Sequence, residues 1–147
     1  MNVPNVLLVE RTSICMGRIR GRSLHEFTMG LARIGSARLG RAMHDAGVCC
    51  GMLHNIGIAH GDYTPANLML DNADRIWIID FGLAESTKST EEKALDLLLM
   101  KRSVRPGLFR RFLAGYRKSC GSSGEIMGRL AEIEKRGRYQ ARTLMAG

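Results

Sequence analysis

Two polar motifs joined by a hairpin-like stretch constrain the fold of this chain more than any other feature. The first motif occupies residues 60–67 (H-G-D-Y-T-P-A-N), and the second occupies residues 80–82 (D-F-G). Between them, two apolar runs at residues 68–70 and 76–79 flank the turn-rich tetrad at residues 71–74. That pattern predicts a β-hairpin, which would bring the second motif back beside the first.

The order and spacing of three polar residues in these motifs are typical of enzymes that transfer the γ-phosphate of ATP. Asp62 is the candidate catalytic carboxylate, which would accept or orient the proton of the attacking hydroxyl group. Asn67, through its amide oxygen, and Asp80, through its carboxylate, are candidate ligands of Mg²⁺ bound to the ATP phosphates. Each residue alone also suits an ordinary turn or cap, but their joint order and strand context favour the phosphate-transfer site.

Most of the remaining chain is predicted to be helical. Apolar residues recur at three- to five-residue steps from about Leu31 to His54, which predicts one long helix, although glycines within it lower the helix propensity. Three more helices are predicted at residues 90–105, 108–116 and 126–133, with a loop at residues 121–124.

The start of the chain differs from this helical remainder. Two short apolar runs, Val6–Val9 and Ile14–Met16, predict a pair of strands. Ser23 followed by Glu26 has the spacing of a helix-capping box.

The residues around both motifs resemble those of a known group of atypical kinases. Gly61 stands where eukaryotic protein kinases usually carry Arg. In this respect the motif resembles that of aminoglycoside, choline and RIO kinases and of the kinase subunit of the KEOPS tRNA-modification complex (the PRPK family). Residues 79–83 (I-D-F-G-L), Ser86 and residues 91–97 (E-E-K-A-L-D-L) are similar to the KEOPS kinase pattern, and residues 134–138 (E-K-R-G-R) are similar to its basic end. The resemblance extends from about Ile56 to the C-terminus.

This resemblance implies an α+β, protein-kinase-like fold with a mostly helical C-lobe, short β-hairpins and a remnant of the N-lobe sheet. Residues 1–22 would be the remnant of N-lobe strands and hinge, and residues 23–147 the C-lobe. Met16 and Ile19 would face the adenine of ATP. His60 would support the loop beneath the D-F-G turn rather than react directly.

Asp96 is a further residue to which the resemblance gives a structural role. It would support the catalytic loop from the helix beneath it. The alternative is a surface carboxylate, but the apolar neighbours at residues 94–98 predict a buried side chain that needs hydrogen-bond partners.

The implied activity is that of a serine/threonine kinase or ATPase that uses ATP and Mg²⁺. The implied partner is a tRNA-modifying subunit with an ATPase-like fold, with which such kinases support formation of threonylcarbamoyladenosine on tRNA. Two alternatives remain: a catalytically weak scaffold lobe that binds the partner ATPase and tRNA, and a small-molecule phosphotransferase. The second would need an additional helical subdomain, for which 147 residues leave no room.

The chain also departs from the kinase pattern. It contains no G-x-G-x-x-G loop and no V-A-I-K-like strand, and these elements normally hold the ATP phosphates. We therefore expect weak or absent kinase activity from this chain alone. We also expect exposed apolar surface on the strands at residues 6–9 and 14–16, which favours association.

Charge and cysteine content bear on partners and compartment. A net charge of +8 suits nucleotides, nucleic acids or acidic partners, although a solvated basic surface explains it as well. The basic tail could contact tRNA phosphates, or could be a solvated helix end that suits the helix dipole; its basic residues are Lys135, Arg136, Arg138 and Arg142.

The four cysteines form no C-x-x-C pair, as expected for reduced thiols. No apolar run approaches the ~20 residues of a membrane span, so a cytoplasmic protein is expected.

Overall fold

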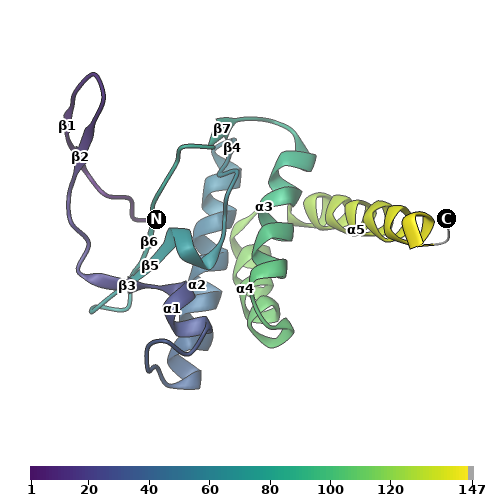
Figure 1. Cartoon of the computed structure of the whole chain (residues 1–147), viewed down its shortest axis with the longest axis horizontal. Coiled ribbons are helices and arrows are strands. Elements are labelled where there is room, and N and C mark those ends of the chain that lie inside the picture. The colour runs from purple at the N-terminus through teal and green to yellow at the C-terminus, as the bar shows by residue number, and fades with distance from the viewer. Residues whose placement is uncertain (146–147) are drawn as a thin grey trace.

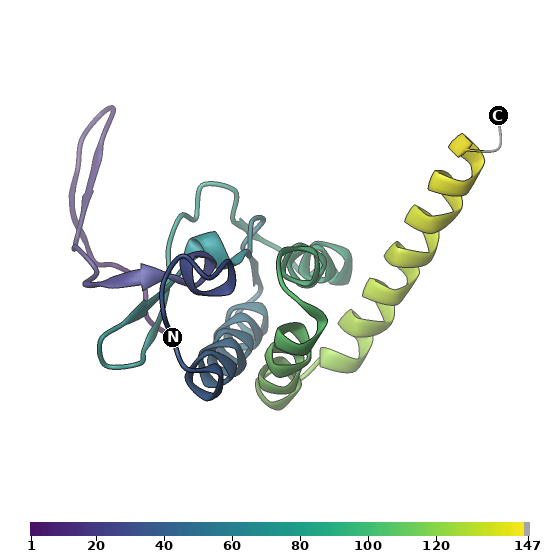
Figure 2. The same cartoon turned by 60° about the horizontal axis from the view of Figure 1, so that its bottom comes forward.

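The computed structural model describes the backbone of residues 1–145 and the side chains of residues 1–137. Its architecture is α+β, as predicted, with helices that pack beside small antiparallel sheets. Figure 1 shows α2, α3 and α4 lying together, with β1, β2, β3, β5 and β6 on one side of them and β4 and β7 at one end of α2. Figure 2 shows the β1–β2 hairpin and α5 projecting from opposite ends of this body.

The strands form three small sheets in the described part of the chain. β1 (Val6–Val9) pairs with β2 (Ile14–Met16), and β4 (Ile58–Ala59) pairs with β7 (Glu85–Ser86). The third sheet has the order β3-β5-β6 and consists of β3 (Gly21–Ser23), β5 (Leu68–Asp71) and β6 (Ile76–Ile78). Both predicted strand pairs, β1–β2 and β5–β6, are therefore confirmed.

The helices agree with the predicted segments except at two starts. The elements are α1 (Leu24–Thr28), α2 (Ser36–Asn55), the 3₁₀ helix η1 (Pro65–Asn67), α3 (Thr90–Ser103), α4 (Pro106–Ser119) and α5 (Ser123–Met145). The predicted capping box of Ser23 and Glu26 is present at α1. The long helix predicted from about Leu31 begins only at Ser36, after Gly35, whose extended backbone (φ −64°, ψ 141°) forms the N-cap. Similarly, α5 begins at Ser123, inside the predicted loop at residues 121–124.

Two glycines explain why a glycine-rich segment forms a stable helix at the centre of the fold. A methyl group at Gly47 of α2 would overlap the backbone carbonyl of Phe112, and one at Gly115 of α4 would overlap that of His44. The two helices thus approach each other closely, and the packing gained offsets the low helix propensity of glycine. The same core includes residues of α3 and of the β5–β6 strands, with Tyr63, Leu68 and Ile78 fully or nearly fully buried.

None of the helices in the described residues combines the length and the apolar character that crossing a bilayer requires.

Candidate active site

His60 links the first motif to the strand that leads into the second. Its side chain is fully buried, and its Nε2 lies 3.1 Å from the carbonyl oxygen of Ile79. The backbone N–H of Asp62 donates to His60 Nδ1 at 3.3 Å. Because a backbone N–H can only donate, Nδ1 is the acceptor, and the proton on Nε2 is the one donated to Ile79. The His60 ring also lies 4.9 Å from that of Phe81, so one side chain joins both motifs.

Asp62 and Asn67 lie together in residues 60–67, the candidate catalytic loop. The Asn67 amide Nδ2 donates to the Asp62 carboxylate at 2.7 Å and to the Asp62 backbone carbonyl at 2.9 Å. These bonds fix the direction of the Asp62 carboxylate and direct the Asn67 nitrogen toward it. The Asn67 amide oxygen is consequently the atom left to face a cation.

Asp80 follows β6 and lies next to the Asn67 backbone. The N–H of the preceding residue, Ile79, donates to the Asn67 carbonyl at 3.0 Å. Asp80 adopts a positive φ of 59°, a conformation that is uncommon for residues other than glycine and is frequent at functional sites. Its side chain is exposed, and its Oδ1 accepts a bond of 3.3 Å from the Gly82 N–H.

Gly61 occupies a position that only glycine fits without strain. Its φ is +80°, and a methyl group there would overlap the backbone carbonyl of Leu83. The left-handed backbone and the contact with the segment after D-F-G both require the absence of a side chain. This is the physical reason why Arg is absent from this position of the chain.

Asp96 of α3 lies beneath the catalytic loop and is fully buried, which confirms its predicted burial. Its Oδ2 accepts from the His60 N–H at 2.7 Å, and its Oδ1 accepts from the Gly61 N–H at 2.9 Å. A third donor, His54 Nε2, lies 3.0 Å from Oδ2. The buried carboxylate is thereby matched by three donors, as burial of a charge requires.

His54 and Tyr116 belong to the same buried network, and the sequence analysis missed both. His54 Nδ1 and the Tyr116 hydroxyl lie 2.8 Å apart. Burial raises the pKa of the Tyr116 phenol, so the phenol keeps its proton and can donate it to His54. A signal existed in the sequence, since a histidine on the apolar face of a predicted helix needs a polar partner when it is buried.

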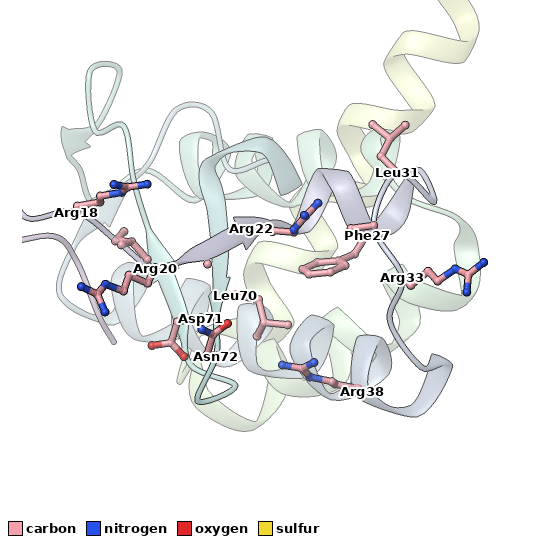
Figure 3. A pocket seen from close by; sticks show the side chains of 13 residues that line it. Arg18, Arg20, Arg22, Phe27, Leu31, Arg33, Arg38, Leu70, Asp71 and Asn72 are labelled. Atoms are coloured by element: carbon pink, nitrogen blue, oxygen red, sulfur yellow. The ribbon is translucent and has the colours of Figure 1, made fainter.

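The two residues predicted to face adenine are placed differently from the motif residues. Met16 lies in β2 with an exposed side chain. Ile19 lines a cleft rich in arginine, shown in Figure 3, and none of Asp62, Asn67 and Asp80 lines that cleft. The structure therefore brings Asp62, Asn67 and Asp80 together through the β5–β6 hairpin and leaves Met16 and Ile19 outside that group.

The oxygen donors of the site suit a magnesium ion that is also held by phosphate. Among the side chains that the structure describes, no three His, Cys, Asp or Glu residues gather into a metal-binding group. Mg²⁺ commonly binds one or two protein oxygens together with water and substrate phosphates rather than a full protein cage. One amide oxygen from Asn67 and one carboxylate from Asp80 fit that requirement.

Comparison with known proteins defines the family. The profile of the protein kinase domain matches residues 8–105. This chain belongs to the protein kinase family. It is 36% identical, over 97% of its length, to a probable serine/threonine-protein kinase BUD32 homolog of Archaeoglobus fulgidus, of which it covers 70%.

Two further relatives have names that refer to the KEOPS complex and to tRNA threonylcarbamoyladenosine biosynthesis. It is 32% identical over 97% of its length to the KEOPS complex subunit Bud32 of Pyrococcus abyssi, of which it covers 68%. It is also 32% identical over 89% of its length to a probable bifunctional tRNA threonylcarbamoyladenosine biosynthesis protein of Methanobrevibacter smithii, of which it covers 24%. The predicted resemblance to KEOPS kinase subunits is thus confirmed, and the chain belongs to the family of KEOPS-related atypical kinases.

Part of the predicted basic tail falls outside the described side chains. Lys135 is exposed, whereas Arg136 forms an ion pair of 2.9 Å with Glu91 of α3. The side chains of Arg138 and Arg142 lie outside the described residues.

Proposed function

We propose that this chain is an atypical serine/threonine kinase or ATPase subunit that transfers the γ-phosphate of ATP with the help of Mg²⁺. The observation that carries the proposal is the Asn67–Asp62 hydrogen bond, held in a loop that Asp96 ties to α3. A carboxylate oriented in this way can accept the proton of an attacking hydroxyl group or water molecule. A loop held by buried hydrogen bonds keeps that geometry without reorganisation during the reaction.

The roles of the individual residues follow from their positions. Asp62 would orient and deprotonate the nucleophile, and Asn67 would hold Asp62 and offer its amide oxygen to Mg²⁺. Asp80 would offer its carboxylate to the same cation. The bound ion would supply charge that offsets the negative charge on the phosphates. His60 would hold the D-F-G segment against the loop, and Asp96 would support the loop from below.

We further propose that this chain alone is a weak enzyme. Its sequence contains neither a Gly-rich loop nor a V-A-I-K-like lysine, and each such group can contribute several kcal/mol of transition-state stabilisation. The scaffold function therefore remains a second candidate, and the exposed apolar residues of β1 and β2 favour it because they offer a surface for a partner. The names of the relatives favour both candidates over a small-molecule phosphotransferase.

The partners are proposed from the names of the relatives. A KEOPS subunit and a bifunctional threonylcarbamoyladenosine protein suggest an ATPase-like, tRNA-modifying partner for this chain. The basic C-terminal tail is a candidate contact for the tRNA phosphates. A cytoplasmic location is the corresponding proposal.

The test is Mg²⁺-dependent ATP hydrolysis and autophosphorylation by the purified chain, with and without the ATPase-like partner. Asp80→Ala is the decisive variant, and Asp45→Ala, which removes an exposed carboxylate from α2, is its matched control. Turnover that disappears in Asp80→Ala and persists in Asp45→Ala supports phosphate transfer at this site. Equal turnover in both variants contradicts it, while partner binding without any turnover leaves the scaffold function.

A further inference from the structure

A cleft lined by arginines lies beside the β3–β5 strands, apart from the motif residues. It has a volume of about 640 Å³. Figure 3 shows Phe27 and Leu70 at its centre, with arginines placed around them. The five arginines that line it are Arg18, Arg20, Arg22, Arg33 and Arg38.

This cleft continues into a hollow on each side. A hollow of about 480 Å³ shares Arg18 and Arg20 with it and adds Arg75 and Trp77. Another, of about 700 Å³, shares Phe27, Arg33 and Arg38 with it. The three hollows adjoin through these shared residues, and together they are here called the arginine groove.

Acidic residues neutralise only some of the groove arginines. Three of them form ion pairs, with the distance measured from the guanidinium nitrogen to the carboxylate oxygen. These pairs are Arg22–Glu26 at 3.1 Å, Arg38–Asp74 at 2.6 Å and Arg75–Asp71 at 2.8 Å. Among the side chains that the structure describes, Arg18, Arg20 and Arg33 form no ion pair. These three are exposed, so the groove carries positive charge that no neighbour offsets.

The backbone spaces the groove arginines regularly. Along residues 17–23, exposure alternates, with Arg18, Arg20 and Arg22 exposed and the residues between them half-buried. This period of two is that of an extended strand, in which alternate residues lie about 6.6 Å apart. The spacing is similar to that between neighbouring phosphates along a nucleic-acid strand.

Two aromatic side chains lie in the same groove as these charges. Phe27 lies in the central cleft and Trp77 in the adjoining hollow, and both are half-buried, so part of each ring reaches the groove. The Arg75 guanidinium lies 5.6 Å from the centre of the Trp77 ring. Aromatic rings interleaved with basic residues along a groove are the features with which proteins hold unpaired bases and their phosphates.

We propose that the arginine groove binds a single-stranded segment of nucleic acid, with phosphates on Arg18, Arg20 and Arg33 and bases against Phe27 and Trp77. Three adjoining hollows favour a strand over a mononucleotide, and the aromatic rings favour nucleic acid over an acidic peptide. The groove contains none of the proposed catalytic residues. The proposal is therefore independent of phosphate transfer, and it is tested without ATP.

The test is fluorescence anisotropy with a labelled, unstructured single-stranded RNA and the full chain. The variant Arg18→Gln/Arg20→Gln/Arg33→Gln is expected to bind about ten- to hundredfold more weakly at low salt. The slope of log K against log salt is expected to fall by about 2, because each lost phosphate contact removes roughly 0.7. Binding by the unmodified chain should stay constant between about pH 6 and pH 9, since arginine remains charged there.

The matched control is Arg41→Gln/Arg110→Gln/Arg111→Gln, which removes the same charge from exposed positions on α2 and α4 that line none of the three hollows. It should bind almost as tightly as the unmodified chain, and thermal unfolding of both variants checks that they are folded. Equal weakening by the two variants would show that net charge alone attracts RNA, which overturns the proposal. Absence of binding, equal binding of a mononucleotide, or equal displacement of the strand by polyglutamate overturns it too.

Discussion

The catalytic loop and the β1–β2 hairpin are both short segments beside the helical body, but they are stabilised in opposite ways. Within residues 60–67, the backbone N–H groups of His60 and Gly61 donate to Asp96 of α3, and His60 Nε2 donates to the Ile79 carbonyl just after β6. The hairpin exposes every residue of both strands, with Leu7 at 67% and Val9 at 66% exposure. An isolated two-stranded hairpin is marginally stable in water. The comparison shows that precise geometry lies where the chain supplies buried partners, and there the proposed chemistry is also found.

Removal of the Asp96 carboxylate should destabilise the catalytic loop, which is the better-held of the two segments. Asp96→Ala leaves two backbone N–H groups and His54 without their acceptor in a fully buried site. We expect a loss of about 3–5 kcal/mol in the free energy of unfolding, measured by chemical denaturation. Asp45→Ala, an exposed carboxylate on α2, should change it by less than about 0.5 kcal/mol. A loss below about 1 kcal/mol for Asp96→Ala would show that the network does not hold the loop.

A side chain at Gly61 should disturb the same loop through its backbone. Gly61→Ala forces a positive φ on a residue with Cβ and drives that atom into the Leu83 carbonyl. We expect about 2–3 kcal/mol of destabilisation. Gly128→Ala on α5 provides the control, because nothing lies near that position and alanine should stabilise the helix by up to about 1 kcal/mol. A Gly61→Ala variant that is as stable as the unmodified chain, or more stable, would contradict this account of Gly61.

Local sequence patterns are enough to predict most of the helices and strands of both regions. Short apolar runs predict the strands of both hairpins, a turn-rich tetrad predicts the β5–β6 turn, and the capping box predicts the start of α1. The start of α2 could not be placed, since its N-cap is Gly35, which has no side chain to form the capping hydrogen bond that marks a helix start in a sequence. The role of Gly47 and Gly115 is also not local, because their effect arises only when α2 meets α4.

In the candidate site, too, some residues could be predicted from local sequence and others could not. Asp62, Asn67 and Asp80 are recognisable because their chemistry depends on spacing along the chain. The network of His54 and Tyr116 is different, since these residues are 62 positions apart and meet only through helix packing. The arginine groove likewise joins residues 18–38 to residues 70–77, and only the β3–β5 pairing brings them together.

The β5–β6 hairpin, unlike β1–β2, has a turn that is held by a buried carboxylate, Asp71. Asp71 closes the β5–β6 turn through bonds from the Ala73 and Arg75 backbone and from the Arg75 and Trp77 side chains. Burial alone would raise the pKa of Asp71, but these hydrogen bonds outweigh burial and lower it to about 2. A depressed pKa stabilises the folded state above the unfolded value near 3.8 and loses that effect as pH falls toward 2.

Asp71→Asn should therefore cost about 1–2 kcal/mol at neutral pH, a value reduced for the exposed Arg75 partner. The difference between the two proteins should shrink as pH falls from about 4 to about 2, as measured by denaturant unfolding at each pH. Asp74→Asn, in the same turn but exposed, should show a smaller difference. If the difference in the free energy of unfolding between the two proteins stays constant down to pH 2, the ionised Asp71 carboxylate is not its cause.

The smallest effect on stability is expected in the β1–β2 hairpin. Leu7→Ser/Val9→Ser removes apolar surface that is exposed in the folded chain, so the free energy of unfolding should change by less than about 0.5 kcal/mol. Self-association, measured by sedimentation at several concentrations, should nevertheless decrease, because exposed apolar strands favour edge pairing. Leu31→Ser, exposed at 71% outside the hairpin, should leave association unchanged. A large loss of stability in the double variant would mean that the hairpin packs against the body, and the contrast with the catalytic loop would then disappear.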